Sequence, residues 1–359
     1  MPVFLRSTAR TPYGTFGGAF RRVGPEHLAA LAIRESIKRA GMGPEDIEAL
    51  ILGQALRYGQ GTDPGRQAAL AAELPCPSWA VDQGSLSGVR ALISGIHAIE
   101  SGAHRSVVAA ATCSASTVPY LLPAGRWGHR LGQSTALDPL LLDTLEGGGP
   151  WQLAMEKGLE DLGRGAGDLT AWIAGSRAKA LAPALGSFPV TWKERKGTLT
   201  LTSDESPAQT PHPPVPGWPL PPLADGAASL VLSAERSSIR IAGFRETRAV
   251  RPTEAIITAV RDLLGASGLR AEALDRMEVD ESLLLSPLGL LEAIEGLDPR
   301  CMNPHGGAFA SGQAHGVEGL RLLVSLCHGL AQDGGRFGLA AMESAEGQAF
   351  AILIERTSA

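Results

Sequence analysis

The sequence has little excess charge of either sign. Its 359 residues include 32 Lys and Arg against 37 Asp and Glu, which gives a net charge of −5. Because nucleic acids and anionic membranes attract clustered cations, this balance gives no electrostatic reason to expect either partner. The longest basic run, Lys193 to Lys196, is interrupted by Glu194, and we expect it to lie in a solvated hairpin.

Long hydrophobic runs and cysteine motifs are missing as well. No apolar run reaches the roughly 18 residues of a membrane-spanning helix, and MPVFLRSTARTPYG at the start does not resemble a signal peptide. The four cysteines form no C-x-x-C pair, so neither a disulfide framework nor a zinc site is indicated. We therefore expect a cytoplasmic protein with buried thiols and no bound metal.

An internal repeat divides the chain into two related halves. The segment SGVRALISGIHAIESGAHRSVVAAA, from Ser87, aligns without a gap with EGLRLLVSLCHGLAQDGGRFGLAAM, from Glu318. An earlier pair, PEHLAALAIRESIKRAGMGPEDIEALIL and PTEAIITAVRDLLGASGLRAEALDRMEV, agrees at nearly the same offset. The length suggests two or three domains, and the repeat indicates that two of them are similar.

Each half is predicted to contain both helices and strands. Apolar residues spaced near 3.6 residues predict helices that end at Gly41 and Gly268. The helix after Ser87 is apolar on nearly all sides, so it must be covered on most of them. Continuous apolar runs such as RSVVAAAT and ASLVLSA predict strands buried on both faces. Together these patterns predict a layered α/β architecture with two sheets and helices shared between them.

A segment of different composition, from about residue 117 to residue 222, separates the two halves. It contains Pro- and Gly-rich runs such as GWPLPP, HPPVPG and EGGGP, and we expect it to form a capping subdomain. Within it we predict helices over Trp151–Leu162 and Leu169–Ala182 and a hairpin over Val190–Thr202. The predicted domains are an N-terminal half (1–116 with 223–236), the inserted subdomain (117–222) and a C-terminal half (237–359).

Five motifs, in the right order on a duplicated chain, resemble the thiolases. They are RTPYGTFGGAF, DPGRQAALAAELP, ADGAASLVL, NPHGGAFASGQAHG and GLAAMESAEGQAFAILIER. The resemblance covers nearly the whole chain and implies a duplicated five-layered αβαβα fold with an inserted loop subdomain. It also implies an acyl-CoA C-acyltransferase, in which a nucleophilic cysteine exchanges an acyl group with coenzyme A, and dimers that form through the first-half sheet.

The resemblance also locates four catalytic positions, and each carries a different residue here. Ser85, in DQGSLSG, stands at the nucleophilic cysteine, and Gln313, in SGQAHG, stands at the histidine base. Glu343 replaces the second catalytic cysteine, and Asp280 replaces an asparagine that orients an oxyanion-hole water. Because losing one member of a catalytic unit can cost on the order of 10⁴ to 10⁶ in turnover, we do not expect ordinary thiolase activity.

Other residues near these motifs are alternative candidates. His305, in NPHGG, and His315, two residues after Gln313, could replace the missing base. Asp280 and Glu343 could form an acid/base pair for a different reaction. Pro221 stands where thiolases carry a serine that holds the pantetheine arm, and a proline offers neither a hydroxyl nor a backbone donor. We therefore predict no bound cofactor, with a coenzyme A thioester as a candidate ligand or substrate.

Three hypotheses about function remain open. The first is a pseudo-enzyme subunit that dimerises with itself or joins an intact thiolase-type subunit, with a small zinc-ribbon/OB protein as a further candidate partner. The second is an active acyltransferase or condensing enzyme that uses Ser85 or Glu343. The third is a protein that binds acyl-CoA or lipid without turnover.

Overall fold

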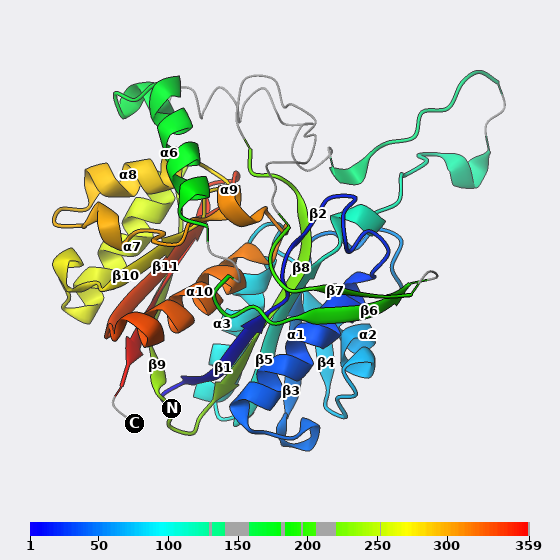
Figure 1. Ribbon diagram of the computed structural model, residues 1–359, viewed down its shortest axis with the longest axis horizontal. Coiled ribbons are helices and arrows are strands. Elements are labelled where there is room, and N and C mark those ends of the chain that lie inside the picture. The colour runs from blue at the N-terminus through cyan, green and yellow to red at the C-terminus, as the bar shows by residue number, and fades with distance from the viewer. Residues whose placement is uncertain are drawn as a thin grey trace.

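The computed structural model describes residues 1–128, 131–140, 158–180, 184–194, 197–205, 220–251 and 253–357. In Figure 1 the N-terminal half, blue to cyan, lies beside the C-terminal half, yellow to red, and helix α6 lies above the latter. Within the described ranges, no helix is long and apolar enough to cross a membrane.

Strands of both halves form one mixed sheet. In the first half they are β1 (Phe4–Arg10), β2 (Gly14–Thr15), β3 (Ala49–Gly53), β4 (Ser78–Val81), β5 (Ser106–Cys113) and β8 (Ala224–Ser233). In the second half they are β9 (Ile239–Arg248), β10 (Arg276–Val279), β11 (Phe337–Glu343) and β12 (Gln348–Arg356). Their order is β10-β11-β12-β9-β1-β8-β5-β3-β4, with β2 paired to β8.

The two halves of this sheet meet at a very short pairing. Only Phe4 and Leu5 of β1 pair with Arg240 and Ile239 of β9. The sequence predicted two sheets. In the structure these two sheets are joined edge to edge into one continuous sheet. Strand β8, which follows the inserted segment, lies between β1 and β5 and so belongs to the first half.

Helices cover both faces of each half. They are α1 (Pro25–Ala40), α2 (Pro64–Ala71), α3 (Ser87–Glu100), α6 (Ala166–Ala178), α7 (Glu254–Ser267), α8 (Leu285–Ala293), α9 (Ala308–Ser311) and α10 (Glu318–Asp333). Helices α1 and α2 pack on one face of the first half and α7 on the outer face of the second. Between the halves, α3 contacts α10, and α10 touches strands of both, as Figure 1 shows. This arrangement confirms the five-layered αβαβα fold.

The repeat and the helix ends match the sequence prediction. The aligned segments form α3 followed by β5 and α10 followed by β11, in equivalent places of the two halves. Helices α1 and α7 end at Gly41 and Gly268, whose φ angles of +67° and +64° favour glycine.

The inserted segment is described in part. Its hairpin consists of β6 (Val190–Glu194) and β7 (Gly197–Leu201), within the predicted range. Helix α6 begins three residues before the predicted start, because Asp168 accepts a hydrogen bond from the Gly165 N–H and so caps an earlier turn. The other predicted helix, Trp151–Leu162, is described only in part. Its residues 151–157 lie outside the described residues, and residues 158–161 are helical.

Candidate active site

Ser85 lies in the turn that leads into α3, and it is half-buried. The turn is closed by its neighbour Ser87, whose hydroxyl donates to the Gly84 carbonyl over 2.7 Å. For the hydroxyl of Ser85, the described residues offer no carboxylate or imidazole partner.

The loop that carries Gln313 packs against this turn. The Gly88 N–H donates to the Gly316 carbonyl over 2.9 Å, so the loop is tied to the start of α3. Gly316 has a φ of +80°, and a Cβ there would lie 3.5 Å from the carbonyl oxygen of Gly84. The fold therefore brings together the segments of Ser85 and Gln313, which are more than two hundred residues apart in the sequence.

The backbone and the side chain of Gln313 are both held in place. Its N–H donates to the Pro222 carbonyl over 2.6 Å, and its carbonyl accepts from Ala224 over 2.8 Å. Its side-chain Nε2 donates to Ser282 Oγ over 2.5 Å. Gln313 is thus a fixed hydrogen-bond donor at the junction between the two halves.

Asp280 follows the last residue of β10 and is only 2% exposed. Its Oδ1 accepts from the N–H of Ser282 over 3.2 Å and from the hydroxyl of Ser282 over 2.9 Å. Burial, followed by the negative charge of Glu318, raises the pKa of Asp280 to about 7, against the opposing effects of Ser282 and Arg321.

Glu343 ends the neighbouring parallel strand β11 and is equally buried. Its Oε2 accepts from the Thr253 N–H at the start of α7, over 3.1 Å, and from Ser286 Oγ of α8, over 3.2 Å. Its Oε1 has no partner among the described residues. Burial raises the pKa of Glu343 to about 7, so the protonated form is stabilised. The described contacts include no hydrogen bond between Glu343 and Asp280.

The three remaining candidates lie in different surroundings. His305 accepts at Nδ1 from Arg276 over 2.7 Å; burial and then this guanidinium lower its pKa. Arg276 is the first residue of β10, whereas Asp280 follows its last residue, and a role of His305 as a base stays a prediction. His315 is half-buried, and its backbone hydrogen bonds to the thiol of Cys113. Pro221 is buried just before β8.

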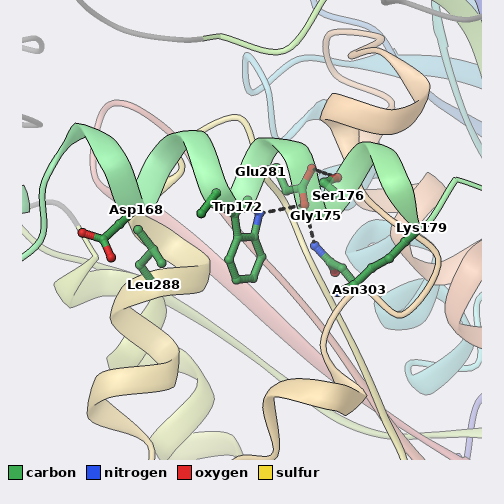
Figure 2. A pocket seen from close by; sticks show the side chains of 9 residues that line it. Asp168, Trp172, Gly175, Ser176, Lys179, Glu281, Leu288 and Asn303 are labelled. Carbon is green, nitrogen blue, oxygen red and sulfur yellow. Dashed lines mark hydrogen bonds between the residues drawn. The ribbon is translucent and has the colours of Figure 1, made fainter.

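Sequence reasoning missed Glu281, the most heavily hydrogen-bonded carboxylate of this region. It is fully buried, and it accepts at Oε1 from Trp172 over 2.9 Å and from Asn303 over 3.3 Å. At Oε2 it accepts from Ser176 over 2.8 Å and from the Phe309 N–H over 3.1 Å. Figure 2 shows the first three of these bonds beside a cavity of about 290 Å³. Because Trp172 and Ser176 belong to α6, Glu281 anchors that helix to the second half.

A second buried group was also missed: Glu318 and Arg321 are charged side chains buried in the first turn of α10. Glu318 accepts from Arg321 over 2.6 Å, and from the hydroxyl of Tyr13 and the N–H of Ala314 over 3.2 Å each. The group links α10 to the first half and to the loop of Gln313. In the described ranges, no set of three or more His, Cys, Asp or Glu side chains is placed to hold a metal ion.

Solved structures of two other proteins share the fold of this chain. A thiolase from Ascaris suum, Acat5, in complex with coenzyme A, superposes with a TM-score of 0.88 at 28% identity. The match covers 99% of this chain and 100% of that one. The Bacillus anthracis acetyl-CoA acetyltransferase superposes with a TM-score of 0.89 at 26% identity, covering 99% of each chain.

The family follows from the sequence matches. Residues 3–212 match the thiolase N-terminal domain and residues 239–356 the thiolase C-terminal domain, so the chain belongs to the thiolase family. The acetyl-CoA acetyltransferase IA of Candida tropicalis is 31% identical over 402 aligned residues, covering 100% of this chain and 98% of that protein. The Schizosaccharomyces pombe acetyl-CoA acetyltransferase is 29% identical over 394, covering 99% and 98%. The assignment of Ser85, Asp280, Gln313 and Glu343 to catalytic positions stays a prediction.

Proposed function

We propose that this chain is a thiolase-family subunit of acyl-CoA metabolism that no longer forms or cleaves carbon–carbon bonds. The observation that carries the proposal is the side chain of Gln313, held as a donor to Ser282 Oγ. A neutral amide cannot accept a proton at neutral pH, so it cannot act as the base of a nucleophile. Ser85 itself makes no described hydrogen bond to a base, and an unassisted hydroxyl stays protonated.

The two buried carboxyls support the same conclusion. At neutral pH, groups with pKa values near 7 such as Asp280 and Glu343 are partly ionised. The resemblance places both at positions that serve oxyanion stabilisation or proton transfer in thiolases. A negative charge there repels the anion that forms next to the carbonyl during condensation, instead of stabilising it.

An activity assay in both directions tests this loss. The chain is incubated with acetyl-CoA, and separately with acetoacetyl-CoA and free coenzyme A, beside an acetyl-CoA acetyltransferase with an intact Cys-His-Cys set. We expect no turnover above the protein-free rate, because neither a thiolate nor a basic imidazole occupies the site. Turnover that depends on Ser85 or Glu343 would favour the altered acyltransferase instead.

The proposal includes association through the first-half sheet. Strand β4 ends the sheet path, so one of its edges has unpaired backbone groups. Trp79 of β4 is 37% exposed and Leu70 of the adjacent helix α2 is 59% exposed, and apolar surface of this kind is typical of an interface. We expect the partner to be a second copy or an intact thiolase-type subunit.

Light scattering coupled to size exclusion measures this association. The chain is expressed alone and together with an intact thiolase. A dimer mass in either case supports the proposal, whereas monomers that elute independently in both cases contradict it.

A further inference from the structure

A hydroxyl, a carboxylate and an amide meet at the end of β10, and the function proposed above gives the hydroxyl no role. Ser282 Oγ donates to Asp280 Oδ1 over 2.9 Å and accepts from Gln313 Nε2 over 2.5 Å. We propose that Ser282, with Asp280 as its base, is an acyl acceptor that takes an acyl group from a thioester. The substrate class, a thioester, rests on the proposed function, whereas the choice of Ser282 as the nucleophile rests on the geometry.

The geometry fits an activated nucleophile. A distance of 2.9 Å lies within the roughly 2.6 to 3.2 Å over which a base can take a proton from a hydroxyl. Ser282 is half-buried, whereas Asp280 is almost completely buried, so Ser282 is the more accessible residue of the pair. Ser85, by contrast, makes no described hydrogen bond to a carboxylate or an imidazole.

The surroundings of Asp280 make it a better base than an ordinary aspartate. An exposed aspartate, with a pKa of about 3.9, is too weak a base to be effective near neutral pH. Burial and the facing charge of Glu318 raise the pKa of Asp280 to about 7. Arg321 of the same helix and the hydrogen bonds from Ser282 act in the opposite direction.

Gln313 supplies a donor beside the same oxygen. Its Nε2 carries two N–H bonds, and Ser282 Oγ is the acceptor for one of them. Its backbone is fixed by hydrogen bonds to Pro222 and Ala224, so the amide is held in place before a substrate arrives. The second N–H is suited to the carbonyl oxygen of an acyl group attacked by Ser282.

The step balances without any redox partner. Ser282 Oγ attacks the carbonyl carbon of the thioester, and the Oγ–C bond forms as the C–S bond breaks. The hydroxyl proton moves to Asp280 and from there to the leaving thiolate. The products are an ester on Ser282 and a free thiol, and no proton is removed next to the carbonyl.

Peptide mapping by mass spectrometry tests the inference on the full chain. The protein is incubated with acetyl-CoA, and separately with p-nitrophenyl acetate, and is quenched in acid before digestion. We expect one acetyl group on the peptide that contains Ser282 with both reagents. Ser282→Ala should lose it, and Asp280→Asn should slow acetylation by on the order of 10² to 10⁴. Ser101→Ala, an exposed serine after α3, is the matched control and should be acetylated at the wild-type rate.

A second variant keeps the test informative if Ser282→Ala fails to fold. Ser282→Cys places a thiol at the same position and should yield a thioester that hydroxylamine releases. Acetylation of Ser85, an unmodified wild-type chain, or an Asp280→Asn rate equal to that of the wild type would each overturn the inference. None of these results would show condensation activity. Failure of this inference can therefore be distinguished from failure of the proposed loss of thiolase chemistry.

Discussion

Replacing Glu281 by alanine should weaken the attachment of α6 to the second half. The carboxylate accepts four hydrogen bonds, and two of its donors keep another bond afterwards: Asn303 still donates to the Val279 carbonyl, and Ser176 still accepts from the Gly307 N–H. The Trp172 indole and the Phe309 N–H are then left without a partner. The buried Phe309 N–H costs roughly 1 to 3 kcal/mol, and the half-buried Trp172 indole costs less because water can reach it from the cavity. We expect a net loss of about 2 kcal/mol.

Glu281→Gln should have a smaller effect, because its oxygen still accepts from Trp172 and Asn303. Its NH₂ group then faces the Phe309 N–H, so about 1 to 2 kcal/mol is lost. The matched control is Glu292→Ala, which removes a 60% exposed partner of Arg164 and should cost less than about 0.5 kcal/mol. Urea denaturation gives the free energies of unfolding, and hydrogen exchange reports the protection of α6. Unchanged α6 protection in Glu281→Ala, with a loss no greater than in the control, would refute this reasoning.

Three further predictions concern other parts of the molecule. Since the folded-state pKa values of Asp280 and Glu343 are raised to about 7, the folded state holds extra protons between about pH 4 and 7. The free energy of unfolding should therefore fall as pH rises through this window. The double variant Asp280→Asn/Glu343→Gln should show a smaller fall in urea titrations, whereas the same slope of unfolding free energy against pH in the double variant would contradict this prediction. Tyr13→Phe removes a donor to buried Glu318 and should cost about 1 to 2 kcal/mol in the same assay; no measurable loss would show that the bond contributes nothing. Trp79→Lys adds a charge on β4 itself and should shift the size-exclusion mass towards the monomer, whereas an unchanged mass would place the interface elsewhere.

The sequence predicts the fold well because the fold depends on periodic patterns. Apolar spacing and the helix-ending glycines Gly41 and Gly268 are local signals, and the repeat then places the second half by analogy with the first. The junction of the two sheets was not predictable, because it depends on only two residue pairs between β1 and β9. The start of α6 was misplaced because the apolar pattern begins at Leu169, while the Asp168 cap lies before it.

The candidate site was predictable only as positions along the chain. Motif order located Asp280 and Glu343, but their partners come from α7, α8 and the turn after β10, which no local pattern specifies. Ser282 was missed because Asp-x-Ser after a strand is also typical of an ordinary turn. Glu281 was missed because a glutamate after a strand gives no sign of burial, and its donors lie on α6, on α9 and in the loop before α9.

Exchange of the methyl protons of acetyl-CoA in deuterium oxide tests the central claim most directly. Thiolase condensation requires a base that removes one of these protons, and under the proposed function neither Gln313 nor Glu343 acts as that base. Proton NMR of the wild-type chain with acetyl-CoA should show exchange no faster than in buffer alone. Faster exchange that Glu343→Gln abolishes would show that proton abstraction survives, and would contradict the loss of thiolase chemistry.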